Sequence, residues 1–146
     1  MISMAIKIPA AFFAAKEMVF IGYSSRHREF CTMAAQAFTD HGTKVYPVNP
    51  NQGDYGVEVF SSIETVPAQP ELAYVLTNRR HNDGLAARLA AKGVKRVLFN
   101  SRQSTDEGLS AECRSLGMTV AVSCPMMALG KGLHRFHGWL AGVERA

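Results

Sequence analysis

The chain has 146 residues, 47% of them hydrophobic and 19% charged, which is typical of a globular domain and excludes a disordered or fibrous protein. Its 16 lysines and arginines against 12 acidic residues favour anionic ligands only weakly, and no basic block indicates nucleic-acid binding. Three cysteines without C-x-x-C spacing indicate neither a disulfide framework nor a zinc site, and no apolar run reaches the roughly 18 residues of a membrane-spanning helix. We therefore expect one domain over residues 1–146, with neither nucleic acid nor a membrane as partner.

The N-terminal residues are predicted to form a short helix, over residues 9–17, at the edge of a sheet. The stretch 9–15 also resembles the core of a secretion signal, with Lys7 before it. Cleavage there would leave the first strand almost at the new terminus, so we expect a cytoplasmic protein. Its core is expected to span residues 18–124, with terminal helical extensions at 1–17 and 125–146.

The first strand is predicted at residues 18–21, a continuous apolar run typical of a strand buried on both faces. The chain then passes through a turn at Gly22 into a helix. The apolar stripe expected for this helix comprises Phe30, Met33, Ala34, Ala37 and Phe38.

Three glycines mark joints at which a helix is expected to end and a β-rich run to begin. They are Gly42, Gly93 and Gly117, each followed at once by apolar and β-branched residues. Glycine just past a helix adopts the left-handed conformation at little cost and lets the chain turn back into the sheet. The three joints therefore predict alternating helices and strands.

The middle of the chain is less regular. Residues 49–70 lack helical periodicity, and we expect only a short strand at 57–60 there, followed by another strand at 72–76. The next helix is predicted to bury Leu85, Ala86 and Leu89.

The last helix of the core is predicted to begin at Ser104, because the spacing from Ser104 to Glu107 is that of a capping box. Its expected apolar stripe is Leu109, Cys113 and Leu116. A further helix is expected at residues 126–143. Its apolar residues indicate packing, either within the chain or against a second copy in a homo-oligomer.

Together these elements predict an α/β fold. Right-handed crossovers between alternating strands and helices give a doubly wound domain, with a mostly parallel sheet of five to six strands and helices on both faces. In such a domain the ligand crevice lies beyond the carboxyl ends of the strands, where the strand order reverses.

The turn after the first strand is the first candidate site. Gly22 allows close approach of a ligand, and a following helix N-terminus attracts phosphate through its free amides and dipole. Ser24 and Ser25 either donate to phosphate oxygens or simply cap the helix, and Arg26 is placed to add a charge-assisted contact.

Several nucleotide motifs are absent from the sequence. Ser24 and His27 stand where the G-x-G-x-x-G dinucleotide motif has its second and third glycines. The second strand ends in Val48, Asn49 and Pro50 rather than in the acidic residue that holds the ribose of NAD. No Walker A sequence is present, which argues against ATP bound through a P-loop.

The chain resembles the small stand-alone CoA-binding proteins, which are similar to the CoA-binding domain of the succinyl-CoA synthetase alpha subunit. The resemblance rests on residues 19–24, a hydrophobic strand followed by Gly-Tyr-Ser, and on 41–50, which end in Pro-Val-Asn-Pro. Residues 59–67 are similar to the family's short strand and turn, and 123–125 to its closing cysteine segment. The resemblance covers about residues 16–125.

The resemblance implies a Rossmann-like domain that binds coenzyme A or acyl-CoA. The phosphates would lie at the turn after the first strand, the adenosine beside Asn49 and Pro50, and the pantetheine along the turn after the strand at 72–76. The residues assigned to the ligand in this way are Gly22, Tyr23, Ser24, Ser25, Arg26, Val48, Asn49, Pro50, Thr77, Asn78, Arg79 and Asn100.

The sequence also departs from the family's pattern. The family often has lysine where this chain has Asn51, and it tends to have Phe-Arg near Leu76 and Thr77 and a Gln-containing turn at residues 100–102. The cations placed to compensate are Arg79, Arg80 and Arg102.

The function indicated is non-catalytic or regulatory CoA binding, with no catalytic residue and no metal ligand assigned. His134 and His137 lack an obvious third metal ligand, and Cys124 is expected to be an inert thiol. The alternative is an NAD(P)-dependent oxidoreductase or redox-sensing domain that uses the same crevice. In a third interpretation the site is vestigial and the C-terminal segment drives assembly.

Overall fold

A computed structural model of the chain describes residues 8–129. The strands are β1 (Glu17–Ile21), β2 (Lys44–Val48), β3 (Leu72–Val75), β4 (Arg96–Phe99) and β5 (Thr119–Val122). The α-helices are α1 (Arg28–Asp40), α2 (Leu85–Lys92), α3 (Glu107–Ser115) and α4 (Pro125–Leu129), and short 3-10 helices are η2 (Ala10–Phe13), η3 (Ile63–Thr65) and η4 (Arg79–His81).

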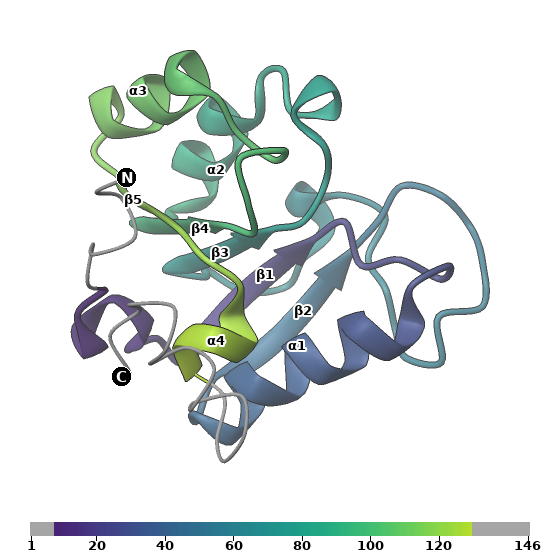
Figure 1. The fold of residues 1–146 in the computed structure, drawn as a ribbon. Helices are drawn as coiled ribbons and strands as arrows, with labels where there is room; N and C mark the ends of the chain where they lie inside the picture. Colours follow the sequence, from purple (N-terminus) through teal and green to yellow (C-terminus); the bar gives the residue numbers. More distant parts are fainter. Residues whose placement is uncertain (1–7, 130–146) are drawn as a thin grey trace.

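The strands form one parallel sheet with the order β2-β1-β3-β4-β5 (Figure 1). The chain runs outward from β1 to β2, crosses back to β3 on the other side of β1, and then continues outward to β5. The order therefore reverses between β1 and β3, whose carboxyl ends meet at the same edge of the sheet. The predicted α/β doubly wound fold is confirmed.

The short strand expected at residues 57–60 is reduced to a single parallel bridge between Val48 and Phe60, outside β2. The Phe60 amide donates to the Pro47 carbonyl at 2.8 Å, and the Phe60 carbonyl accepts from the Asn49 amide at 2.9 Å. Longer pairing is limited because β2 ends at Val48 and proline offers no N–H to the open edge. Because Phe60 occupies the position of a sixth strand, the spatial order becomes that of a Rossmann fold.

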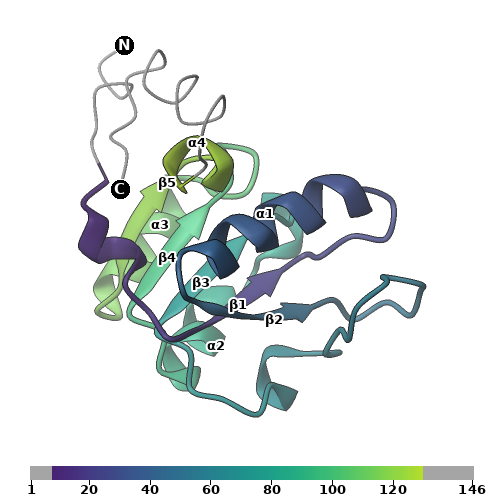
Figure 2. The same cartoon turned by 90° about the horizontal axis from the view of Figure 1, so that it is seen from below.

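Side chains of the strands alternate between two apolar layers. Val19, Val75 and Phe99 face the layer that contains side chains of η3, α2 and α3. Phe20 and Tyr74 face the opposite layer, formed with α1, α4 and η2. Figure 2 shows α1 and α4 on one side of the sheet and α2 on the other. Burial on both faces explains why the inner strands β1, β3 and β4 contain continuous apolar runs.

The glycine joints are confirmed, with φ values of +94° at Gly42, +96° at Gly93 and +93° at Gly117. The predicted helix stripes are correct at most positions, but Met33 is 43% exposed and Leu116 is 46% exposed. In α1 Cys31 is fully buried, whereas Met33 is exposed. The buried stripe of α1 is therefore centred on Cys31, Ala34 and Phe38.

The predicted start of the last core helix is wrong by two residues. The N-cap of α3 is Asp106, whose carboxylate accepts from the Leu109 amide at 2.8 Å. Ser104 is buried outside the helix, and its carbonyl accepts from the side-chain amide of Asn82 at 2.8 Å. This tertiary contact fixes Ser104 in the loop and leaves Asp106 to cap the helix.

The expected terminal helices are only partly observed. Between residues 9 and 17, only η2 is helical, because the Lys16 carbonyl already accepts from the Lys44 amide in the sheet at 2.8 Å. At the other end α4 begins at Pro125, while residues 130–143 of the expected helix lie outside the described residues. None of the helices in residues 8–129 is long and apolar enough to cross a membrane.

Candidate functional site

Gly22 ends the first strand in a conformation that only glycine adopts easily. Its φ is +91°, and a Cβ atom there would lie 2.8 Å from Thr77 Cγ2 and 2.9 Å from the Thr77 amide nitrogen. The Leu76 amide also donates to the Ile21 carbonyl at 2.9 Å. The loops after β1 and β3 are therefore in direct contact, and a side chain at Gly22 would separate them.

Ser24 organises the turn between Gly22 and α1. Its Oγ accepts from the amides of Arg26 at 3.1 Å and His27 at 3.3 Å, while its own amide donates to Cys31 Sγ at 3.3 Å. Ser24 therefore caps the turn and not α1, whose N-cap residue His27 makes no side-chain capping bond. Burial raises the pKa of the Cys31 thiol, which keeps it protonated in this role.

Asn49 connects the end of β2 to the same turn. Its Nδ2 donates to the Tyr23 carbonyl at 2.7 Å, and its Oδ1 accepts from the Asn51 amide at 2.8 Å. A carboxylate could accept the second bond but could not donate the first. The amide side chain is therefore required by the backbone geometry where a Rossmann dehydrogenase has its acidic residue.

A cavity of about 330 Å³ lies at the carboxyl ends of β1, β2 and β3. It brings together five of the predicted site residues, namely Gly22, Val48, Asn49, Pro50 and Thr77. The other lining residues are Ile21, Asn51, Ser61, Ser62, Ile63, His81, Asn82, Asp83, Leu85 and Arg88. The cavity thus lies at the reversal of strand order, where doubly wound proteins bind ligands.

Tyr23, Ser24, Ser25 and Arg26 form the turn beside this cavity without lining it. The Tyr23 ring is buried against Phe20, with centroids 5.0 Å apart. Ser25 and Arg26 are exposed, and among residues 8–129 Arg26 makes no ion pair. The Arg26 guanidinium is therefore available to an anion.

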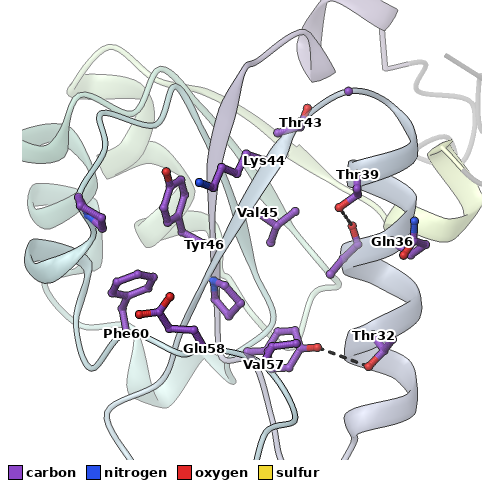
Figure 3. Close-up of a pocket in the computed structure, with 15 residues that line it drawn as sticks. Thr32, Gln36, Thr39, Thr43, Lys44, Val45, Tyr46, Val57, Glu58 and Phe60 are labelled. Carbon is purple, nitrogen blue, oxygen red and sulfur yellow. Dashed lines mark hydrogen bonds between the residues drawn. The ribbon is translucent and has the colours of Figure 1, made fainter.

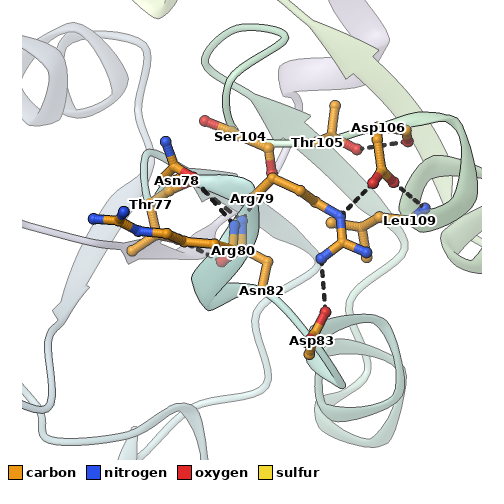
Figure 4. A network of polar contacts seen from close by, with 10 residues as sticks. All are labelled: Thr77, Asn78, Arg79, Arg80, Asn82, Asp83, Ser104, Thr105, Asp106 and Leu109. Atoms are coloured by element: carbon orange, nitrogen blue, oxygen red, sulfur yellow. Dashed lines mark hydrogen bonds and ion pairs between the residues drawn. The ribbon is translucent and has the colours of Figure 1, made fainter.

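Arg79 also lies outside the cavity lining, because its guanidinium is held by two carboxylates (Figure 4). Its Nε lies 2.9 Å from Asp106 Oδ2, and its Nη1 lies 2.8 Å from Asp83 Oδ1. The bond from the Leu109 amide and the Arg79 guanidinium lower the pKa of Asp106. Arg79 therefore links η4 to the N-termini of α2 and α3.

Asn78 and Asn100 likewise have local partners. Asn78 accepts from the Arg80 amide at 3.1 Å and so caps η4. Asn100 accepts from the Tyr74 hydroxyl at 2.7 Å, and burial raises the pKa of that hydroxyl. These side chains shape the loops after β3 and β4 from outside the cavity lining.

Sequence reasoning missed Asn82 and Arg88, which both line the cavity. Asn82 is 2% exposed and exchanges hydrogen bonds with Thr77, at 2.7 Å between the Thr77 hydroxyl and Asn82 Oδ1. Arg88 pairs with Glu64 of η3, with Nε 3.0 Å from Oε2 and Nη2 2.9 Å from Oε1. No local motif indicates either residue, because Asn82 also bonds to the distant Ser104 carbonyl and Arg88 pairs with the distant Glu64.

A second hollow, of about 890 Å³, lies between α1 and the edge strand β2 (Figure 3). Thr32, Gln36 and Thr39 of α1 line one side, and Lys44 and Tyr46 of β2 line the other. It includes Tyr23 but no other predicted site residue, and it opens on the edge of the sheet rather than on the strand reversal. We therefore place the candidate site in the smaller cavity.

Comparison with solved structures supports the fold. Prb, the PH1109 protein redesigned for binding, is 21% identical, with a TM-score of 0.70 over 90% of this chain and 87% of that one. A hypothetical protein from Pyrococcus horikoshii OT3 is 20% identical, with a TM-score of 0.68 over 90% and 87%. A Thermus thermophilus protein is 16% identical, with a TM-score of 0.67 over 89% and 94%.

Comparison at the level of sequence identifies the family. No curated protein matches the chain. The profile of the CoA binding domain matches residues 16–130, which include every strand of the sheet and every residue that lines the cavity. The chain therefore belongs to the family of CoA-binding domains.

Proposed function

We propose that this protein binds coenzyme A or an acyl-CoA and acts as a non-catalytic, regulatory CoA-binding protein. The observation that carries the proposal is the cavity at the strand reversal, to whose lining both Gly22 and Asn49 contribute. Asn49 stands where a ribose-binding acid would lie, and its side chain is already hydrogen-bonded to two backbone groups. This arrangement favours CoA over a nicotinamide dinucleotide.

The turn after β1 fits the pyrophosphate of CoA. Gly22 lets the loop after β1 pack directly against Thr77, and α1 begins directly beyond the turn. The amides of the first helical turn and the positive end of the helix dipole attract phosphate oxygens. Arg26 supplies the nearby positive charge.

The cavity fits the adenosine end of the ligand. Its volume of about 330 Å³ is at the small end of ligand pockets, so it would take one portion of CoA and leave the remainder outside. Val48, Asn49 and Pro50 form the wall next to β2, and Thr77 forms the wall next to β3. The pantetheine arm would leave along the turn at Thr77 and Asn78.

The two charged side chains that line the cavity, Asp83 and Arg88, support binding rather than chemistry. Asp83 is paired with Arg79, and Arg88 with Glu64. A general acid or base needs a group that can exchange a proton with a substrate. Paired and exposed ions of this kind are suited to positioning.

Isothermal titration calorimetry with CoA, acetyl-CoA, NAD and ATP tests the proposal. We expect CoA and acetyl-CoA to bind, and NAD and ATP to bind more weakly or not at all. Gly22→Ala should abolish binding through its clash with Thr77, and Arg26→Gln should weaken CoA binding about 10-fold. Arg114→Gln removes the same charge from an exposed position on α3 and serves as control. Absence of CoA binding at millimolar concentration would overturn the proposal.

A further inference from the structure

The cavity contains one cation that the sequence motifs do not indicate. Among the lysines and arginines of residues 8–129, Arg88 alone contributes to the lining. It reaches the cavity from α2, whereas Asn49 and Asn51 reach it from the chain after β2. Its side chain is 47% exposed, so a ligand in the cavity could contact it directly.

Arg88 is oriented by one carboxylate. Glu64 engages the guanidinium along its Nε and Nη2 edge, at 3.0 and 2.9 Å. A guanidinium has five N–H donors, and this bidentate contact uses two of them. Within the described residues, the Nη1 end has no hydrogen-bond partner, so a fork of donors remains for an anion.

The other candidate cations are less suitable. Arg79 is neutralised by Asp83 and Asp106 and lies outside the lining. Arg80 also lies outside the lining, with its Nε 3.2 Å from His81 Nε2. Asn51 lines the same cavity but carries no charge.

We propose that Arg88 is the specificity-determining residue for the 3′-phosphate of the adenosine, and that Glu64 is its positioning residue. This inference rests on the proposed CoA function and identifies the part of CoA that the chain recognises. As a dianion, the phosphate carries more negative charge than the Glu64 carboxylate. It can accept hydrogen bonds from the N–H donors of Arg88 that Glu64 leaves free, without breaking the ion pair. Dephospho-CoA, which lacks only this phosphate, is the discriminating probe.

The test compares calorimetric affinities for CoA and dephospho-CoA in the wild type, Arg88→Gln and Arg114→Gln. We expect the wild type to prefer CoA by about 10- to 100-fold, the range of a charge-assisted contact. Arg88→Gln should lose this preference and bind dephospho-CoA as the wild type does. Arg114→Gln, with the same change of charge, should retain it.

A merely structural ion pair would give a different pattern. Glu64→Gln breaks the Glu64–Arg88 pair but keeps the cation, so under our proposal it retains a preference for CoA. If Arg88→Gln and Glu64→Gln lose affinity for CoA and dephospho-CoA equally, the role of Arg88 is overturned and the CoA function stands. The same holds if the wild type binds both ligands equally. If neither ligand binds the wild type, the proposed function itself fails.

Discussion

At the scale of single residues, Asn49 explains why a Rossmann-like site lacks the usual acid. Its amide donates to the Tyr23 carbonyl and accepts from the Asn51 amide, and thereby fixes the turn after β1 against the end of β2. A ribose-binding carboxylate at this position would repel the carbonyl that the amide now satisfies. The same side chain therefore fixes the local structure, and under our proposal it also selects among the ligands of the cavity.

We predict that Asn49→Asp lowers both stability and CoA affinity. Loss of the donor leaves the part-buried Tyr23 carbonyl without its partner, which costs about 1–2 kcal/mol, measured by urea unfolding. The added charge should weaken CoA binding in calorimetry. Asn51→Asp adds the same charge to the same cavity and keeps the Asn49 amide. Its CoA affinity should therefore fall while its stability stays unchanged. Equal stability of the two variants would contradict this role of Asn49.

The residues at the ends of strands could be predicted because sequence shows where a buried strand stops. Gly22, Asn49 and Thr77 directly follow such runs, and parallel strands bring their carboxyl ends together. Arg79 shows the limit of this reasoning, because its two carboxylate partners bind it outside the cavity lining. Arg88 could not be predicted at all, since its place depends on how α2 packs on η3.

At the scale of elements, α2 holds η3 against the sheet through two contacts. Arg88 pairs with Glu64, and Lys92 Nζ donates to the Val66 carbonyl at 2.7 Å. Ile63 and Val66 are buried beneath these polar contacts. The irregular chain that forms one wall of the cavity is thereby tied to a regular helix.

The Glu64–Arg88 pair predicts a dependence of stability on pH. The bond from Arg88 lowers the pKa of Glu64 from 4.5 to about 2. The unfolded chain therefore binds the proton first, so the stabilisation is complete above pH 4.5 and is lost as the pH falls toward 2. Because both side chains are half exposed, we expect at most about 1 kcal/mol.

Thermal unfolding of the wild type and Glu64→Gln at several pH values measures this effect. At neutral pH the variant should melt about 2–4 °C lower, and the difference should shrink as the pH falls below 4.5. Glu112→Gln, an exposed change on α3, is the control for removal of one acidic charge. A difference that stays constant with pH would show that the ion pair does not cause it.

The elements with a glycine joint could be predicted, and those that depend on tertiary contacts could not. The capping-box pattern at Ser104 competes with Asp106, and the buried contact with Asn82 decides between them. The stripe of α1 is narrower than predicted, because Met33 lies at its solvent edge. Periodicity finds a helix but does not define the angular width of its buried face.

At the scale of the whole molecule, the site depends on contacts between loops from both halves of the sheet. Gly22 touches Thr77, Thr77 bonds to Asn82, and Asn82 reaches the Ser104 carbonyl. This chain of contacts extends from β1 to the loop before α3. The sequence indicates the class of fold and the edge where we propose that the ligand binds, but it does not indicate this connection.

Phe60 has a further consequence for the way the molecule opens. Among the described residues, its bonds to Pro47 of β2 and to Asn49, just beyond β2, are the only backbone pairing between residues 50–70 and this edge of the sheet. We therefore expect the chain around Phe60 to open in a local fluctuation below the cost of global unfolding, while η3 stays tied to α2. In hydrogen–deuterium exchange, the Phe60 amide should exchange faster than amides of β3 in the free protein.

Saturating CoA should slow exchange at Phe60 more than at β4, because a ligand in the cavity binds only the closed form. Unchanged exchange at Phe60 in the presence of bound CoA would place the ligand elsewhere. The exchange rate of this single amide at the edge of the sheet therefore reports whether the cavity is occupied. It can be measured by mass spectrometry without labelling the ligand or changing the sequence of the protein.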